Sequence, residues 1–298
     1  MSLSQVTSGR AFEYGIAISF SKFLNASILD NSQIRLAELS FGLCTSQEQS
    51  KIVRAADEIS LFLIAHDNRL IETQCSISLQ SDQTGKNGDV RDILIHNNIT
   101  HEDVGISAKN RHYAVKHSRL SDKIDFGKEW FGVNCSEKYF STVVPIFNEL
   151  RLKQREGLQW KNIANKKQIY YDPILEIFQE EMLELFNNHT IVVAGGLLKY
   201  LLGRYDFYKI IKENGDVSAI SFNLNNTLKW GSRLPLPTRI IEISRKPTSQ
   251  TTIIMTFDNG WQLSFRIHNA STLVEPSLKF DINIIGLPSS VSRNVIKY

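Results

Sequence analysis

The segment GDVRDILI, residues 88–95, is followed after a short polar insert by GISAK, residues 105–109. Each segment contains an apolar run with a charged residue at one end. Asp92 directly precedes the first run, and Lys109 closes the second. Buried strands seldom carry charge without a use for it. If the two runs pair as neighbouring strands, Asp92 and Lys109 meet at one edge of a sheet. Ser107 then shares a face with Lys109, because side chains alternate along a strand.

A carboxylate beside a lysine at a sheet edge is suited to phosphodiester hydrolysis. This reaction needs a carboxylate that holds a divalent cation against the scissile phosphate, and a cation or base that orients water and offsets charge in the transition state. Asp89 is an alternative or additional metal ligand, and spacing alone does not separate it from Asp92. We favour Asp92 because the apolar run begins directly after it. The competing interpretation is that both aspartates cap a turn and that Lys109 lies on the surface.

A basic segment, NRHYAVKHSRLS from Asn110 to Ser121, follows directly. Its side chains donate hydrogen bonds of the kind that phosphate oxygens and base edges accept. The residues that we expect to contact nucleic acid here are Asn110, Arg111, His112, Lys116, His117, Ser118 and Arg119. The alternative is a solvated basic loop, but a metal site immediately before the segment favours nucleic-acid binding.

Charge is unevenly distributed along the chain. Residues 1–106 carry 8 basic and 13 acidic side chains, residues 107–128 carry 6 and 2, and residues 229–298 carry 9 and 4. The corresponding net charges are −5, +4 and +5. This asymmetry indicates a polyanionic partner that is held by two separate segments.

Helical patterns occur in the first two thirds of the sequence. Apolar residues at helical spacing predict a helix over residues 9–24, with Glu13 beside the apolar stripe. Thr45 and Glu48 predict a capping box at the start of a second helix. Residues 146–187 are mostly helical in pattern, and their role, packing or dimer contact, stays open.

Strand patterns complete a prediction of a mixed α/β (α+β) fold, with a central mixed sheet flanked by helices. Short apolar runs from residue 73 predict consecutive strands, and beyond Asn214 the chain becomes β-rich, with a hairpin turn at Asp258–Gly260. We place a soft boundary there. Residues 1–214 form a catalytic core with a helical insertion, and residues 215–298 form a β-rich DNA-recognition part that completes the core or follows it.

Composition excludes several classes of protein. The 298 residues are 42% hydrophobic, enough for a sizeable core, and the sequence has no long apolar run that predicts a membrane span. The start, MSLSQVTSGR, lacks the order of a signal peptide, so we expect a cytoplasmic protein without membrane contact. Cys44, Cys75 and Cys135 are widely spaced, which argues against a zinc site or disulfides and predicts buried, free thiols.

The stretch GDVRDILI…GISAKNRHYAVKHSRLS resembles the catalytic core of the PD-(D/E)xK nucleases, and specifically that of the HaeIII-type restriction endonucleases, whose members cut the palindrome GGCC. Two other segments are similar to the same family: GRAFEYG near the start of the chain, and FRIHNASTLVEPSLKFDI over residues 265–282. The resemblance therefore involves both ends and the middle of the chain.

The resemblance implies roles for individual residues. It makes Asp92, with Asp89, the metal-binding aspartate and Lys109 the catalytic lysine. Ser107 departs from the usual superfamily pattern, in which an acidic residue lies two positions before the lysine, so the metal has one ligand fewer. Glu13 is the expected replacement, because nucleases of this superfamily often supply a glutamate from an N-terminal helix. Glu102 and Asp103 are weaker candidates, since they fall in the insert between the strands.

In the C-terminal segment, polar residues alternate with apolar ones and suggest target recognition, since arginine bound to guanine is the commonest specific contact in the major groove. The candidates for base contact are Arg266, His268, Asn269 and Ser271. An ordinary polar strand face is the alternative for each of them.

Together these features predict a bacterial, cytoplasmic, Mg²⁺-dependent endonuclease that cuts duplex DNA at a short palindrome. Cutting both strands of a palindrome favours a homodimer on DNA, and the resemblance implies a cognate DNA methyltransferase as genetic partner. The alternatives are a repair or recombination nuclease of the same fold, a DNA-binding module without catalysis, and an interaction protein in which residues 88–92 form a structural turn.

Overall fold

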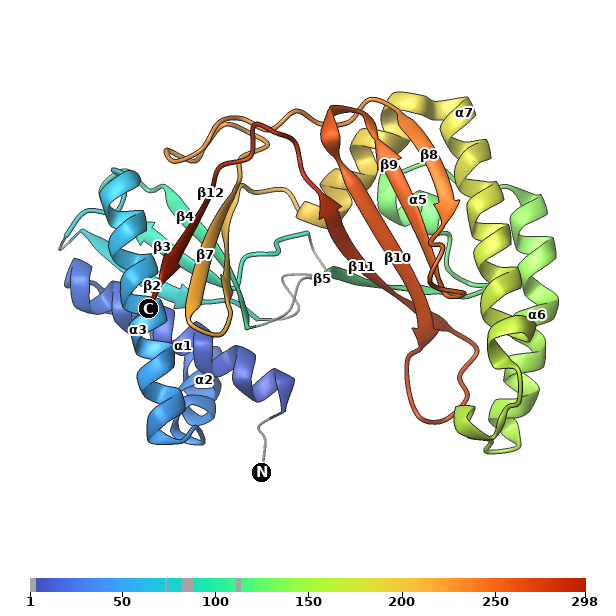
Figure 1. Cartoon of the computed structure of the whole chain (residues 1–298), viewed down its shortest axis with the longest axis horizontal. Helices are drawn as coiled ribbons and strands as arrows, with labels where there is room; N and C mark the ends of the chain where they lie inside the picture. The colour runs from blue at the N-terminus through green and yellow to red at the C-terminus, as the bar shows by residue number, and fades with distance from the viewer. Residues whose placement is uncertain (1–3, 73, 82–87, 111–113) are drawn as a thin grey trace. The chain divides into compact units, whose positions relative to one another are not determined.

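The computed structural model describes residues 4–72, 74–81, 88–110 and 114–298, and the chain forms two compact units (Figure 1). Unit 1 comprises residues 1–113, 202–234 and 290–298, whereas unit 2 comprises residues 114–201 and 235–289. Each unit has its own sheet. The chain therefore passes between the units several times.

Among the described residues, seven strands form a mixed sheet in unit 1, in the order β1-β2-β3-β4-β6-β7-β12. The strands are β1 (Ser27–Ile28), β2 (Cys75–Leu79), β3 (Ile93–Asn97), β4 (Asp103–Asn110), β6 (Phe207–Lys212), β7 (Asp216–Phe222) and β12 (Arg293–Lys297). β2, β3 and β4 are successive antiparallel neighbours, as the sequence predicts. β4 then pairs in parallel with β6, which lies far along the chain. The predicted mixed α/β fold is confirmed.

The helices of unit 1 are α1 (Gln5–Leu24), α2 (Ser32–Gly42) and α3 (Ser46–His66). The predicted helix over residues 9–24 lies within α1, whose apolar stripe is buried against β2, β4 and α3. Gly15 permits a close approach of α1 and α3, because a Cβ atom there would lie 2.4 Å from Cγ2 of Ile52. Thr45 and Glu48 form the predicted capping box at the start of α3.

The two faces of the unit 1 sheet differ in character. Side chains on one face belong to the hydrophobic core that contains α1 and α3; they include Ile106, Ala108, Tyr208 and Ile210. Because side chains alternate along a strand, Ser107, Lys109 and Lys209 project to the opposite face. The polar residues of the candidate site are thus separated from the main core.

Among the described residues, five strands form the antiparallel sheet of unit 2, in the order β5-β11-β10-β9-β8. The strands are β5 (Ala114–Leu120), β8 (Ile240–Arg245), β9 (Thr252–Phe257), β10 (Gln262–Asn269) and β11 (Leu278–Gly286). The predicted hairpin turn at Asp258–Gly260 joins β9 to β10. Asn259 and Gly260 have left-handed φ angles of 59° and 84°, a conformation that these two residue types accept readily.

Three helices lie along one side of the unit 2 sheet in the described chain, and Figure 1 shows α7 beside β8 and β9. They are α5 (Phe126–Phe131), α6 (Glu137–Arg155) and α7 (Asp172–Leu202), which has non-helical backbone angles at His189. A π-helical turn at Lys167–Tyr171 precedes α7. Aromatic rings join helices to sheet: Phe178 of α7 lies 5.9 Å from Phe265 and 4.9 Å from Phe280, between ring centroids. These helices cover most of residues 146–187, where the sequence predicts helix.

The division into units differs from a single boundary near residue 215. β6 and β7 lie on either side of that position, yet they are antiparallel partners in one sheet, and β12 adds the C-terminal residues to the same sheet. Sequence patterns show where strands begin but not which distant strand each will join. The three cysteines are free and buried, as predicted. Among the described helices, none combines the length and apolar character needed to cross a membrane.

Candidate functional site

The pairing of β3 with β4 brings together the side chains of Asp92, Ser107 and Lys109. The backbone N–H of Asp92 donates to the carbonyl of Ile106 at 2.7 Å, which places Asp92 opposite the middle of β4. Oδ2 of Asp92 then accepts hydrogen bonds from Oγ of Ser107 at 3.1 Å, from the Ala108 N–H at 2.8 Å and from Nζ of Lys109 at 2.9 Å. The predicted meeting of Asp92 and Lys109 is confirmed.

The Asp92 carboxylate keeps one oxygen available. Among the described residues, no donor is bonded to Oδ1, and the side chains of Asp92 and Lys109 are 25% and 27% exposed. A ligand from solvent therefore has access to a carboxylate whose other oxygen is held in place. Carboxylate and hydroxyl oxygens are the hard ligands that Mg²⁺ prefers, so Asp92 and Ser107 fit part of a magnesium coordination shell.

Asp89 lies in a different environment. Its carboxylate accepts hydrogen bonds from Nε and Nη2 of Arg91, at 2.8 and 2.7 Å, and from Nε2 of Gln80 at 3.0 Å. Burial raises the pKa of Asp89, but the bonds from Arg91 and Gln80 outweigh this effect and hold the pKa below its usual value. Gly105 makes room for this arrangement, since a Cβ atom there would lie 2.1 Å from Cδ of Arg91. The geometry thus separates Asp89, whose two carboxylate oxygens both accept bonds from Arg91 or Gln80, from Asp92, whose bonds from the described residues all go to Oδ2.

Glu13 lies on α1, the helix packed on the core face of the sheet, whereas Ser107 and Lys109 project to the other face. It has an interaction partner in the structure. In the part of the chain that the structure describes, no three His, Cys, Asp or Glu side chains gather in a group able to hold a metal ion. The predicted ligands Asp89, Asp92 and Glu13 therefore do not form a preformed three-carboxylate cluster.

Sequence reasoning missed Lys209, which belongs to the same site. Lys209 lies on β6 directly beside Ser107 of β4 in the parallel register, and it is only 5% exposed. The pKa of Lys209 is lowered to about 8, first by burial and second by the positive charge of Lys109, while the negative charge of Asp92 acts in the opposite direction. The signal in the sequence was FYKIIK, residues 207–212, where lysines interrupt an apolar run.

Comparison with known proteins identifies the relationship of the whole chain. Residues 9–288 match the family model of the HaeIII restriction endonuclease. The sequence is also 38% identical over 310 aligned residues to the type II restriction enzyme HaeIII of Haemophilus aegyptius, an alignment that covers 98% of this chain and 97% of that enzyme. The chain belongs to the HaeIII restriction endonuclease family. The resemblance seen in residues 88–121 and 265–282 is therefore confirmed and extends over nearly the whole sequence.

In this member of the HaeIII family, the basic segment after Lys109 forms the end of β4 and the edge strand β5. Asn110 donates from Nδ2 to the carbonyl of Ser8 on α1. Predicted contacts Arg111 and His112 lie outside the described residues. In the register of β5 with β11, Lys116 is opposite Ile282 and His117 is opposite Asp281.

The last two predicted contacts of this segment have partners within unit 2. Ser118 is buried, and its hydroxyl lies 3.0 Å from the hydroxyl of Tyr200. Arg119 is about half exposed and bonds Glu275 at 3.2 Å and Ser277 at 2.9 Å. Arg119 is thus the more accessible of the two to a phosphate.

The predicted base contacts of β10 divide into two pairs. Arg266 forms an ion pair of 2.5 Å with Asp281 on β11, and Nε2 of His268 lies 3.1 Å from the same carboxylate. Arg266 is 59% exposed, so it can exchange this partner for one on DNA. Asn269 and Ser271 lie at and after the end of β10, where Asn269 accepts from Tyr171 and donates to the carbonyl of Ser271.

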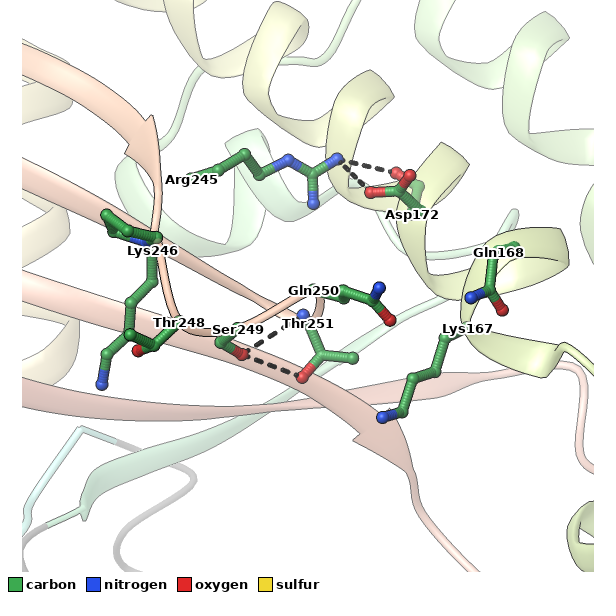
Figure 2. A pocket seen from close by; sticks show the side chains of 10 residues that line it. Lys167, Gln168, Asp172, Arg245, Lys246, Thr248, Ser249, Gln250 and Thr251 are labelled. Carbon is green, nitrogen blue, oxygen red and sulfur yellow. Dashed lines mark hydrogen bonds and ion pairs between the residues drawn. The ribbon is translucent and has the colours of Figure 1, made fainter.

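Unit 2 also has a basic pocket that sequence reasoning did not find, with a volume of about 730 Å³ (Figure 2). Lys167, Arg245 and Lys246 contribute positive charge, and the loop of residues 247–251 contributes hydroxyl and amide groups. Arg245 pairs with Asp172 at 2.8 Å through Nη2, while its Nη1 is buried without a partner in the described chain. The lining has an excess of cations over carboxylates, which suits an anionic group.

Proposed function

We propose that this chain is a type II restriction endonuclease that hydrolyses both strands of duplex DNA at the palindrome GGCC and requires Mg²⁺. The observation that carries the proposal is the Asp92 carboxylate, with Oδ2 held by Ser107, Ala108 and Lys109 and with Oδ1 accepting no bond from the described residues. This arrangement supplies a cation ligand and a fixed ammonium group side by side, the pair that phosphodiester hydrolysis needs. Family membership supports the reaction class, and the name of the relative supports type II cleavage.

In the proposed reaction each side chain has a distinct task. Asp92 would hold the cation, while its bonds to Ser107 and Ala108 keep the carboxylate from rotating. Lys109 orients the attacking water or a phosphate oxygen and offsets negative charge as the transition state forms. When bound, Mg²⁺ would supply Lewis acidity toward the phosphate and the attacking water. The products are ends that carry 5′-phosphates. Glu13 stays a proposed additional ligand at the sheet edge, where α1 meets the end of β4 through the bond from Asn110 to Ser8. Asp89 is second to it because its charge is compensated by Arg91.

Unit 2 is proposed to supply the DNA contacts that take no part in the hydrolysis itself. Arg266 and His268 on β10 are the proposed base-reading residues, because an exposed arginine on a polar sheet face has the geometry to bind guanine. Lys116 and Arg119 are the proposed phosphate contacts of β5. The pocket of Lys167 and Lys246 adds a further phosphate contact.

A palindromic target also has consequences for assembly. Two-fold symmetry of the DNA is matched most simply by two copies of the chain related by a two-fold axis, so we propose a homodimer on DNA. An enzyme that cuts GGCC endangers the genome of its own cell. A cognate methyltransferase that modifies the same sequence is therefore the proposed genetic partner.

The decisive experiment is digestion of phage DNA by the purified protein with Mg²⁺, with EDTA as a control, followed by mapping of fragment ends. The expected result is a discrete set of fragments that end within GGCC, absent in EDTA and absent when GGCC is methylated. Discrete ends at another sequence would overturn GGCC. A smear, or a preference for branched DNA, would point to a repair nuclease. Binding of DNA without cleavage would point to a DNA-binding module without catalysis. Absence of DNA binding at low salt would support an interaction protein instead.

A further inference from the structure

Lys209 is a buried lysine in the middle of the unit 1 sheet. It occupies the position on β6 that is in register with Ser107 on β4, and β6 in turn pairs with β7. With 5% exposure, it is far less accessible than Lys109, whose side chain is 27% exposed. Lys209 therefore lies behind the accessible part of the site rather than on its surface.

A buried, charged lysine in this position destabilises the fold, and this cost suggests that the lysine has a functional role. Removing an ammonium group from water disfavours its charged form, and the pKa of Lys209 falls to about 8 for this reason first and because of the charge of Lys109 second. An apolar side chain of similar length would avoid this cost. Strongly perturbed ionisable groups of this kind cluster at functional sites.

The charges around Lys209 make the site unusual. Lys109 and Lys209 bring two ammonium groups to one face of the sheet, where Asp92 is the carboxylate that acts on Lys209. Asp89 is compensated by its own partner, Arg91. Position 107, which lies beside Lys209, carries a neutral serine hydroxyl. Among the residues that the structure describes, the site is therefore rich in fixed positive charge and poor in carboxylate.

The same strand offers a matched comparison. Lys212 is equally buried, at 6% exposure, but it is in register with Asn110 and therefore belongs to the core face of the sheet. Its ammonium group lies 5.9 Å from the ring centroid of Tyr298, and it acts electrostatically on Glu48. Lys212 is thus a buried lysine of the same strand with a different environment.

We propose that Lys209 is a positioning residue of the active site, whose buried ammonium group holds the Asp92 carboxylate toward β4 and adds a second fixed positive charge beside Lys109. The inference rests on the proposed nuclease function. Lys209 supplies from within the protein part of the charge that neutralises a bound phosphodiester. Position 107 beside it carries a neutral serine, so the fixed charge of Lys209 reduces the dependence of the site on bound cations.

The test compares Lys209→Met with Lys212→Met and with wild type in three measurements. The first is cleavage of the DNA that the wild type cuts, for which Lys209→Met is expected to lower kcat by about 100-fold, with KM changed by less than about threefold. The second is thermal unfolding, where Lys209→Met is expected to have an unchanged or higher Tm, because a desolvated charge has been removed. Lys212→Met is expected to retain kcat.

The third measurement needs no activity: calorimetric titration of the DNA-free protein with Mg²⁺ alone. Removing a positive charge near Asp92 is expected to tighten Mg²⁺ binding by about tenfold in Lys209→Met and not in Lys212→Met. If the wild type cleaves no DNA, the proposed function fails, and this titration still tests the link between Lys209 and Asp92.

Other outcomes overturn the inference. Unchanged kcat and unchanged Mg²⁺ affinity in Lys209→Met would make Lys209 a lysine without a role in the site. A large fall in Tm, with cleavage lost in proportion, would make it a residue of the fold. Lys209→Arg, which keeps the charge, is expected to restore part of kcat, and a failure to do so in a variant with wild-type Tm would also count against a role for the charge.

Discussion

Two of the aspartate-centred clusters of unit 1, around Asp67 and Asp92, are similar in composition and different in exposure. In the first, the Asp67 carboxylate accepts from Nε of Arg69 at 2.9 Å and from the hydroxyl of Tyr208 at 2.7 Å. In the second, the Asp92 carboxylate accepts from Lys109 and from the hydroxyl of Ser107. Asp67 and Arg69 are 0% and 5% exposed, whereas Asp92 and Lys109 are 25% and 27% exposed.

The difference separates a structural use of charge from a chemical one. In the cluster around Asp67, which we call the closed cluster, both carboxylate oxygens are bonded. Arg69 also donates to the backbone carbonyl of Asp103 at 3.4 Å. Burial raises the pKa of Asp67, but Arg69 and Tyr208 outweigh it, so the pKa lies below its usual value. In the cluster around Asp92, which we call the open cluster, no described residue donates to Oδ1, and this oxygen is left for a ligand. An aspartate with all its bonds satisfied stabilises a fold, and one with an open oxygen can bind a substrate or a cation.

The largest expected effect is loss of cleavage when the open cluster is broken. Lys109→Ala should reduce kcat by about 10³-fold or more, because it removes charge that stabilises the transition state. Gel-shift affinity for DNA and Tm should change little, since the side chain is partly exposed. Asp92→Ala should behave alike. Full cleavage by Lys109→Ala would remove that lysine from the mechanism.

The closed cluster should show the opposite result. Asp67→Asn leaves Arg69 buried without its countercharge, so we expect a loss of about 3–5 kcal/mol in the free energy of unfolding. The rate of cleavage by the molecules that remain folded at low temperature should be unchanged. Urea denaturation and kcat, measured on the same sample, check this prediction, and a fall in kcat without a loss of stability would contradict it.

The closed cluster also predicts a pH dependence. The folded pKa of Asp67 is below that of the unfolded chain, so the pair contributes stability above about pH 4 and loses it as the pH falls through the folded pKa. Stability of the wild type should therefore decline more steeply below pH 4 than that of Asp67→Asn. Parallel curves of Tm against pH for the two proteins would show that Asp67 does not titrate as we infer.

A smaller effect sharpens the account of the open cluster. Glu13→Gln keeps size and hydrogen bonding but removes the charge, so it should raise the Mg²⁺ concentration for half-maximal cleavage by about threefold to tenfold, without loss of Tm. Ser107→Glu in that background should restore part of the activity. Cleavage at the wild-type rate across the Mg²⁺ titration would make Glu13 a residue of a packing helix, and Asp89→Asn would become the next variant to test.

The smallest expected effect concerns the basic pocket of unit 2, a third charged cluster, which is open and predominantly positive. Lys167→Ala with Lys246→Ala should weaken binding to duplexes of any sequence and reduce the salt dependence of binding by about one unit for each lysine. Lys128→Ala with Lys199→Ala removes two exposed lysines from the same unit and is the control. A shift in sequence preference with an unchanged salt slope would mean that the pocket reads bases.

Local sequence was sufficient for the features that depend on neighbours in the chain. The capping box of Thr45 and Glu48 spans one helical turn, and the turn at Asp258–Gly260 joins adjacent strands. The meeting of Asp92 with Lys109 follows from a hairpin between consecutive strands, where alternation alone decides which side chains share a face. The pattern therefore predicted the pair at the centre of the candidate site. It did not separate Asp89 from Asp92, because that distinction depends on Arg91, which pairs with Asp89 only where Gly105 leaves space.

Only the tertiary structure decided which distant segments complete the site and the two units. Lys209 reaches Ser107 because β6 joins β4 in parallel, and no local periodicity indicates that pairing. For the same reason the chain folds into two discontinuous units instead of dividing near residue 215, since β7 and β12 extend the first sheet from the far end of the sequence. The sequence by itself determined strands β2 to β4 and β9 to β11, the turn between β9 and β10, the aspartate and lysine of the candidate site, and the family. Long-range pairing depends on the packing of whole sheets and helices against each other, which short stretches of sequence do not contain.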